Sequence, residues 1–209
     1  MTPAEFAALH PRLWRLAMRG AAEGVRRHGL LPAADLARRA GHALPLPRRA
    51  RAQALALPDG TRAILTDNSP LSLTKLAGVL DDGLTPEDWL AMLNARVFLW
   101  PDPKLAQGNL STRRRLGYDS EWHVYDTVKL LAPVWDRAEI APINSGATLR
   151  KPTRRGHATF APLAGLDYQS WRRARRDAGR VQSLDSVKEV TIRGAAPDAA
   201  AALIEVTAA

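Results

Sequence analysis

The chain of 209 residues contains no cysteine. This absence excludes disulfide bonds, thiolate nucleophiles, zinc ribbons and iron–sulfur clusters. No run approaches the ~18 consecutive apolar residues that a membrane-spanning helix needs. Met1–His10 contains Glu5 and lacks a basic start followed by an apolar core, so we expect no signal peptide. These absences predict a soluble, cytoplasmic protein without a membrane partner.

Several familiar catalytic and binding signatures are also missing. The sequence has no Gly-rich phosphate loop with a following Lys, no dinucleotide fingerprint and no Gly-x-Ser-x-Gly elbow. The histidines are dispersed without the spacing of metal ligands, at positions 10, 28, 42, 123 and 157. The sequence therefore predicts no metal site.

Phenylalanine and tyrosine are scarce, with three of each, whereas tryptophan occurs six times and the formal net charge is +9. A positive field of this kind attracts polyanions and speeds their encounter with the protein. It favours nucleic acid, a nucleotide or another phosphate-bearing partner, although a general bias toward Arg, Ala, Leu and Pro would produce the same composition. Most of the tryptophans should pack in the core, and one or two near arginines could stack on a base or a nicotinamide.

The hydrophobic pattern predicts one α+β domain over residues 1–209, with short helices mainly in the N-terminal half around a small mixed or antiparallel sheet. Capping residues and glycines mark helices, which we expect at 2–10, 21–28, 33–40, 71–80, 85–94, 171–178 and 195–202. Apolar or alternating runs predict strands at 13–18, 62–65, 97–100, 123–128, 139–143, 159–160, 187–193 and 203–206. The chain lacks the regular strand–helix alternation of a doubly wound sheet.

Arginine is clustered in four places, and its planar guanidinium pairs bidentately with phosphate and stacks on bases. The segment 44–51 reads as a loop that carries one group, and a second lies at 113–115 in an irregular connection. For the helix at 171–178, a solvated face anchored by aromatic residues is the alternative to a phosphate-contacting face. We predict nucleic-acid contacts for Arg113, Arg114, Arg115, Arg154, Arg155, Arg172, Arg173 and Arg176.

Two features are candidates for a site. Glu189 stands at the entrance of the late strand, where a carboxylate can face a cleft while its strand is held in the sheet. It could equally be a solvent-facing acid at a strand end. The run 143–148, Ile-Asn-Ser-Gly-Ala-Thr, has small residues and an amide that permit close approach of a ligand. We assign Asn144 and Ser145 to ligand binding, although Asn-Ser-Gly is also ordinary turn chemistry.

Three segments together carry a resemblance to a known family. The strand Leu13-Trp14-Arg15-Leu16, the helix 21–28 and the following His-Gly-Leu-Leu are similar to the opening of ADP-ribosyltransferase-like domains. The run 94–100, Asn-Ala-Arg-Val-Phe-Leu-Trp, looks like their central aromatic strand. Glu189, with Pro197 beyond it, resembles the catalytic-glutamate strand of DarT-type DNA ADP-ribosyltransferases. Most of the chain also looks like an uncharacterised bacterial domain family that carries the runs Arg-Val-Phe-Leu-Trp and Pro-Ile-Asn-Ser-Gly-Ala-Thr.

The first resemblance implies NAD as a substrate and Glu189 as the catalytic residue. Such families place His, Thr or Arg at the end of the first strand to hold NAD, and here Arg15 supplies that polar contact. Arg15 or Arg51 would bind the pyrophosphate, and Phe98 or Trp100 would line the nicotinamide pocket. Glu189 would stabilise the oxocarbenium-like centre and serve as the base for the nucleophile.

The sequence leaves three functions open. The first is an NAD-dependent ADP-ribosyltransferase-like enzyme that acts on nucleic acid. The second is a non-enzymatic nucleic-acid-binding module, which requires its arginine clusters on one continuous surface. The third is NAD-dependent removal of an RNA 2′-phosphate, as in the RNA 2′-phosphotransferases. A cleft that unites Glu189 with Arg15 and Asn144 would favour an enzyme.

Overall fold

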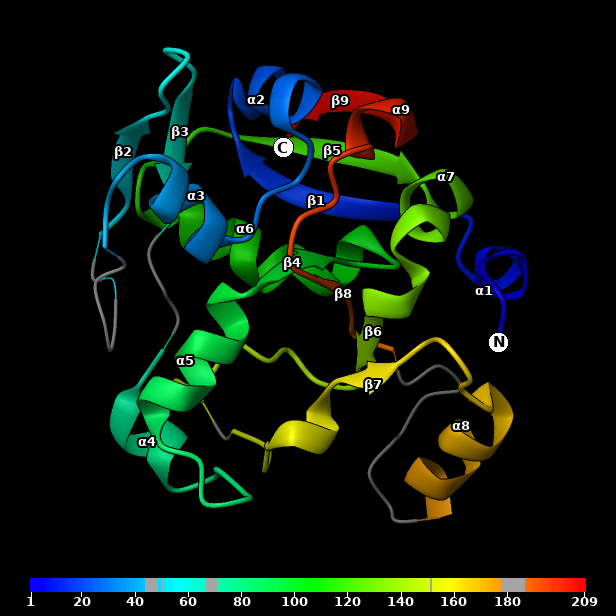
Figure 1. Cartoon of the computed structure of the whole chain (residues 1–209). Coiled ribbons are helices and arrows are strands. Elements are labelled where there is room, and N and C mark those ends of the chain that lie inside the picture. The colour runs from blue at the N-terminus through cyan, green and yellow to red at the C-terminus, as the bar shows by residue number, and fades with distance from the viewer. Residues whose placement is uncertain (44–48, 50, 67–70, 151, 178–186) are drawn as a thin grey trace.

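The computed structural model describes residues 1–43, 49, 51–66, 71–150, 152–177 and 187–209 (Figure 1). Its strands form a three-stranded sheet, a four-stranded sheet and a hairpin, and every strand pairing among the described residues is antiparallel. The first sheet has the order β1-β5-β9, with β1 Arg12–Met18, β5 Ser120–Asp126 and β9 Leu203–Ala208. The second has the order β4-β8-β6-β7, with β4 Arg96–Leu99, β8 Glu189–Arg193, β6 Ala138–Ala141 and β7 Ala161–Pro162. The hairpin joins β2 Gln53–Ala56 to β3 Arg62–Leu65.

The two sheets meet at a pair of tryptophans. The backbone N–H of Trp14 in β1 donates to the carbonyl of Trp100 just after β4, and the reverse bond also forms, both at 2.8 Å. This junction brings the first strand of one sheet beside an edge strand of the other. Arg15 in β1 and Phe98 in β4 therefore approach the same region of the molecule.

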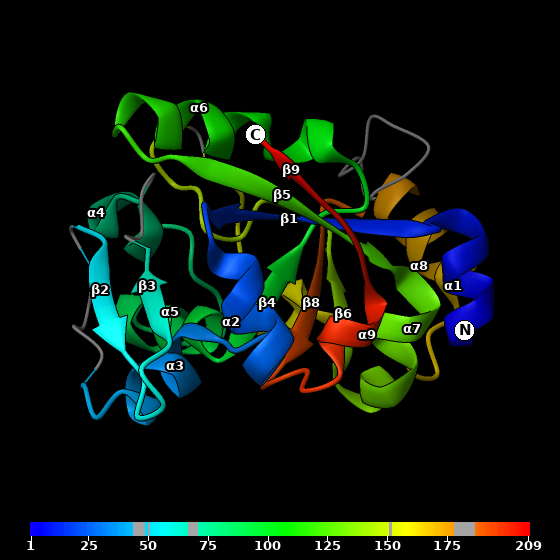
Figure 2. The same ribbon diagram turned by 90° about the horizontal axis from the view of Figure 1, so that it is seen from above.

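Helices cover both sheets. The α-helices are α1 Pro3–Leu9, α2 Ala21–His28, α3 Ala33–Arg39, α4 Leu73–Ala77, α5 Pro86–Asn94, α6 Gln107–Arg115, α7 Thr127–Leu131, α8 Tyr168–Asp177 and α9 Ala199–Ala202. Three short 3₁₀ turns complete the described helical elements, namely η1 Pro103–Ala106, η2 Ala132–Arg137 and η3 His157–Thr159. Figure 2 shows α6 on one side of the first sheet and α2, α7 and α9 on its other side. No helix among the described residues is long and apolar enough to cross a membrane.

The helix starts predicted at Thr2 and Thr85 are confirmed. The hydroxyl of each threonine accepts a hydrogen bond from the backbone N–H three residues later. The carboxylates of Glu5 and Asp88 in turn accept a hydrogen bond from the threonine N–H, so both starts are capping boxes. Such caps supply partners for backbone N–H groups that the first helical turn leaves without one. The local sequence thus sets where α1 and α5 begin.

The alternation of β8 decides which side chains face the site. Val190 and Ile192 point into the large core that the two sheets share, and both are fully buried. Glu189 and Thr191 lie on the opposite face of the sheet, because successive side chains of a strand point to opposite sides. Trp89 and Phe160 pack on that face with their ring centroids 5.6 Å apart.

The α+β class is confirmed, and some element boundaries require correction. Residues 113–115, expected in an irregular connection, form the last turn of α6. Residues 159–160, expected as a strand, include the end of η3, and strand pairing begins only at Ala161. The expected helix at 195–202 is reduced to the four residues of α9. Most of the predicted loop at 44–51 lies outside the described residues.

Candidate functional site: a cation-lined cavity around Glu189

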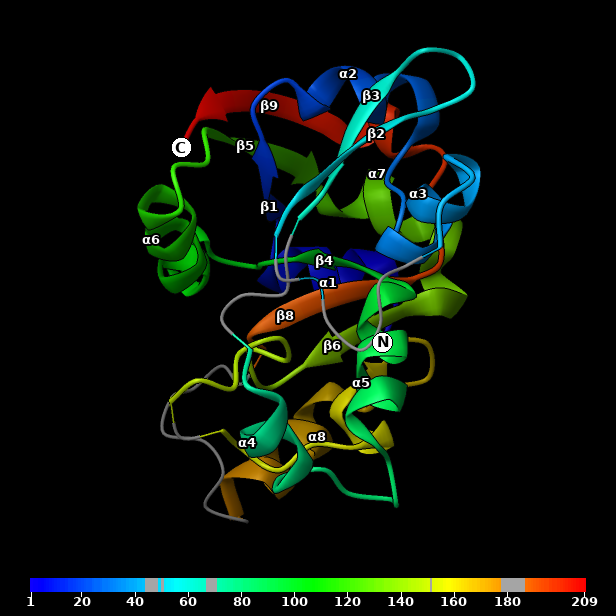
Figure 3. The same ribbon diagram turned by 90° about the vertical axis from the view of Figure 1, so that its left-hand side faces the viewer.

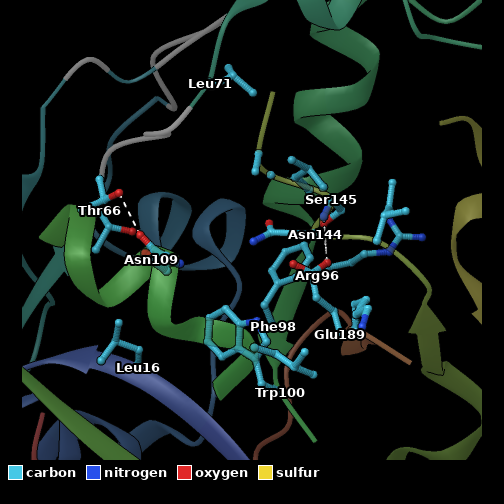
Figure 4. Close-up of a pocket in the computed structure, with 18 of the residues that line it drawn as sticks. Leu16, Thr66, Leu71, Arg96, Phe98, Trp100, Asn109, Asn144, Ser145 and Glu189 are labelled. Atoms are coloured by element: carbon cyan, nitrogen blue, oxygen red, sulfur yellow. Dashed lines mark hydrogen bonds between the residues drawn. The ribbon is translucent and has the colours of Figure 1, made fainter. Parts of the chain in front are cut away.

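A cavity of about 860 Å³ opens between α5, α6, β4 and the segment 142–155. Figure 4 shows Asn144, Ser145 and Glu189 close together on one wall, with Phe98 and Trp100 beside them. The volume lies within the range of small-molecule and cofactor sites, which is roughly 300–1,000 Å³. The cavity is therefore large enough to receive a nucleotide.

Glu189 is the first residue of β8, and its side chain is buried with 3% exposed. Its Oε2 accepts two hydrogen bonds from Ser145, one from the backbone N–H at 3.1 Å and one from the hydroxyl at 2.6 Å. Oε1 accepts no hydrogen bond from the described residues. The solvent-facing alternative for Glu189 is wrong, and one carboxylate oxygen is left for a ligand.

Burial raises the pKa of Glu189 to about 7, although the Ser145 hydrogen bonds and the nearby Arg155 act in the opposite direction. Removal from water disfavours the charged form of a carboxyl group, and hydrogen bonds to the carboxylate favour it. Glu189 can therefore both accept and release a proton near neutral pH. A group of this kind suits general acid–base chemistry.

Ser145 is itself held firmly. Its side chain is 0% exposed, and its carbonyl accepts hydrogen bonds from Arg155 Nη1 at 2.7 Å and from Trp89 Nε1 at 3.3 Å. Because its N–H and O–H both point at Glu189, Ser145 acts as a donor that orients the acid. Its burial excludes it as a nucleophile toward a bulky substrate.

The charge of the cavity wall is strongly one-sided. Glu189 is the one acid among the described lining residues, whereas eight cations line the wall: Arg15, Arg49, Arg96, Arg113, Arg115, Arg150, Arg155 and Lys188. Arg96 is already paired, since it forms a bidentate ion pair with buried Glu139 at 2.8 and 3.2 Å. The remaining positive charge creates a field that favours an anionic ligand.

Arg15 is one of the lining cations with side-chain donors that no described residue uses, together with Arg115, Arg150 and Lys188. Its side chain is half-buried, and it makes no hydrogen bond or ion pair with any described residue. It lies opposite His123 in the β1–β5 ladder. Burial lowers the pKa of His123, and its hydrogen bond to Glu121 only partly offsets this effect. The side-chain donors of Arg15 are thus not used by any described residue.

The structure brings together most of the predicted NAD-site residues and separates the predicted nucleic-acid residues. The cavity is lined by Glu189, Arg15, Phe98, Trp100, Asn144 and Ser145, together with Arg113, Arg115 and Arg155. Outside the lining are Arg51, Arg114, Arg154, Arg172, Arg173 and Arg176. Among these, Arg154 pairs with Asp81, and Arg172 lies over the Tyr168 ring at 5.6 Å.

Arg155 differs from the surface role expected for it, because it is 2% exposed and uses its guanidinium inside the protein. The helix α8 and the helix α6 lie at different ends of the molecule (Figures 1 and 3). The arginine clusters of these two helices therefore form separate surfaces. This arrangement does not supply the continuous basic face that a simple binding module requires.

Sequence reasoning missed several lining residues. Arg49 is buried and donates to the Thr66 carbonyl at 2.9 Å and to Asn94 Oδ1 at 3.0 Å. Lys188 immediately precedes Glu189, and Arg150 lies exposed at the end of the glycine-bearing loop. Their proximity in sequence to Glu189 and to the loop 143–148 was the available signal for the last two.

These features define an α+β protein with a cation-lined cavity around one buried acid. A family model matches residues 11–203, so the chain belongs to DUF7002, a family of unknown function. No curated protein and no solved structure matches the chain.

Proposed function

We propose that this protein is an NAD-dependent ADP-ribosyltransferase-like enzyme that acts on nucleic acid. The observation that carries the proposal is the position of Glu189, the one acid among the described lining residues of a cavity with eight cations. A buried carboxylate with a free oxygen in a positive pocket suits a reaction in which an anionic substrate develops positive charge on a sugar carbon. Cleavage of the nicotinamide–ribose bond of NAD is such a reaction.

The cavity offers complementary surfaces for the parts of NAD. Arginine binds phosphate through parallel N–H donors, and Arg15, which no described residue engages by a hydrogen bond or ion pair, could take that role for the pyrophosphate. Phe98 is half-buried, and Trp100 is 6% exposed, so both offer apolar faces in the same cavity. Either ring could cover the nicotinamide, and Asn144 adds an exposed amide beside Ser145.

In the proposed step the bond between the ribose C1′ and the nicotinamide nitrogen breaks, and its electron pair neutralises the pyridinium ring. The ionised Glu189 then stabilises the positive charge that develops on the sugar. A nucleophile of the acceptor forms the new bond to C1′, and its proton passes to Glu189 or to water. Oε2 stays bound to Ser145 while Oε1 meets the sugar.

Acceptor binding is assigned to the exposed arginines at the edge of the cavity. Arg115 on α6 and Arg150 after the loop both line the cavity and are exposed to solvent. Their guanidinium groups can contact phosphates on either side of a nucleotide that enters the cavity. A polyanionic acceptor fits this edge better than an acidic or neutral small molecule, because it benefits from several cations at once.

The test is NAD cleavage by the purified protein with single-stranded and double-stranded DNA and RNA as acceptors. Nicotinamide release and transfer of labelled ADP-ribose should both occur, and Glu189→Gln should lower the rate at least 100-fold. The matched control is Glu87→Gln, because Glu87 is an exposed acid in the first turn of α5 outside the cavity. No nicotinamide release with any nucleic acid or protein acceptor would contradict the proposal.

A non-enzymatic nucleic-acid-binding role would have to use exposed arginines outside the cavity as two separate contact surfaces, with Arg114 on α6 and Arg173 and Arg176 on α8. It predicts tight binding of nucleic acid that weakens linearly with log salt concentration, without NAD cleavage. RNA 2′-phosphate removal is distinguished by a 2′-phosphorylated RNA substrate, since it would consume NAD only in the presence of that RNA.

A further inference from the structure

Hydrogen bonds hold Ser145 on both sides of its Cα atom. Its N–H and hydroxyl donate to Oε2 of Glu189, while its carbonyl accepts from Arg155 and Trp89. The four bonds leave Ser145 with no free polar group in this region. Any movement of the carbonyl would therefore carry the acid with it.

Arg155 is placed to make this grip rigid. Besides Nη1 on Ser145, its Nε donates to the Thr153 carbonyl at 3.0 Å, and its guanidinium carbon lies 5.9 Å from the Trp89 ring centroid. Trp89 is fully buried, so the stacking partner is fixed as well. A buried guanidinium is costly unless its donors are satisfied. Two of the Arg155 donors form hydrogen bonds to backbone carbonyls, as expected of a cation that fixes the conformation of a loop.

We infer that Arg155 is a positioning residue for Glu189, which it holds through the Ser145 peptide rather than by contact with a ligand. The inference rests on the proposed function for the role of Glu189, but the geometry of the grip does not depend on it. Arg155 keeps Oε2 engaged by Ser145 and so keeps Oε1 turned toward the cavity. Its positive charge also favours the ionised acid.

Two matched substitutions test this role. Arg155→Met removes both the charge and the hydrogen bonds, and Arg155→Lys keeps the charge and can keep one bond to the Ser145 carbonyl. The control is Arg19→Met, because Arg19 is outside the cavity lining and forms an exposed ion pair with Asp119. Trp89→Phe keeps the ring and the Arg155 charge but deletes the 3.3 Å bond to Ser145.

The first measurement is the pH profile of nicotinamide release between pH 5 and 9. Arg155→Met should raise the apparent pKa by about one unit, which lowers the ionised fraction at pH 7 about five-fold from its starting value near one half. At pH 9 Glu189 is mainly ionised in every variant, so a loss of kcat that remains at this pH is caused by a misplaced Glu189 carboxylate. We expect that loss to be about ten-fold for Arg155→Met and about three-fold for Trp89→Phe, with KM for NAD within two-fold of wild type.

Arg155→Lys should recover most of the rate, and Arg19→Met should match wild type. If the loss in Arg155→Met disappeared at pH 9, Arg155 would act by charge alone, and the positioning role would be overturned. It would also be overturned if neither the apparent pKa nor kcat changed. Should Arg155→Met fail to fold, Arg155→Gln takes its place with the same expected losses, because glutamine also removes the charge and is too short to keep both hydrogen bonds of Arg155.

A second measurement separates this inference from the proposed function. The titration of the Glu189 carboxyl carbon can be followed by NMR with ¹³C-labelled glutamate and identified by its loss in Glu189→Gln. A wild-type protein that fails to cleave NAD would refute the proposed enzyme, yet a Glu189 titration raised in Trp89→Phe as well as in Arg155→Met would still support the grip, because Trp89→Phe keeps the Arg155 charge. A wild-type protein that cleaves NAD with an unmoved Glu189 titration in Arg155→Met would refute the grip alone.

Discussion

Replacing Glu189 with glutamine should abolish the part of the pH dependence of the unfolding free energy that comes from titration of Glu189. The pKa of Glu189 is raised by burial from 4.5 to about 7 in the folded protein. The folded state therefore binds this proton more tightly than the unfolded state does. Stability from this group is fully present below the unfolded pKa and is lost as pH rises through the folded value.

The magnitude follows from the size of the shift. Each pKa unit corresponds to about 1.4 kcal/mol, so the wild-type protein should lose about 2 to 3 kcal/mol between pH 5 and pH 8 relative to Glu189→Gln. Glutamine is nearly isosteric and can accept both Ser145 hydrogen bonds through its carbonyl oxygen. The variant should thus fold normally and become more stable than wild type at pH 8.

Urea unfolding of both proteins at pH 5, 6, 7 and 8 measures this difference. Titration of other groups cancels, because it is common to the two proteins. A constant difference in free energy of unfolding across the pH range would refute the reasoning, since it would mean that Glu189 titrates alike in the folded and unfolded states. The same result would remove the physical basis for a proton-exchanging acid in the cavity.

Three further changes have definite expected outcomes. Arg15→Ala should weaken NAD binding by about 10- to 100-fold, as measured by calorimetric titration, because one charge-assisted contact is lost. Thermal unfolding should show a nearly unchanged melting temperature, because Arg15 has no partner among the described residues. Ser145→Ala removes the 2.6 Å bond to Glu189, so the apparent pKa of nicotinamide release should rise while KM for NAD stays within two-fold of wild type; an unshifted pH profile would contradict this. Glu139→Gln leaves the buried Arg96 uncompensated and should cost about 3 kcal/mol of unfolding free energy in urea, and a loss below about 1 kcal/mol would show that water reaches this pair.

Part of the site was predictable because it is encoded locally. The strand pattern around Glu189 and the turn-forming run at 143–148 are short-range signals, and the structure places both at the same wall. The junction of β1 with β4 then brings Arg15 to the same cavity. These residues meet because of how the strands pair, and the sequence pattern alone could not predict the order of the strands in the sheets.

The roles of individual arginines were not predictable, because they depend on burial. Arg113 and Arg115 in the last turn of α6 line the cavity, whereas Arg114 between them does not. Arg154 and Arg155 are adjacent in sequence, yet one is exposed and the other supports Ser145 from inside. Arginines that are neighbours in sequence therefore face solvent, line the cavity or bind backbone carbonyls, and long-range packing decides which.

The direct test of the account is nicotinamide release from NAD by wild-type protein and by Glu189→Gln, measured side by side at pH 7.5 with a single-stranded nucleic acid present. Cleavage by wild type and a loss of at least 100-fold in the variant are expected. Equal rates in the two proteins, or no cleavage in either, would show that the buried acid in this cavity does not carry the chemistry assigned to it.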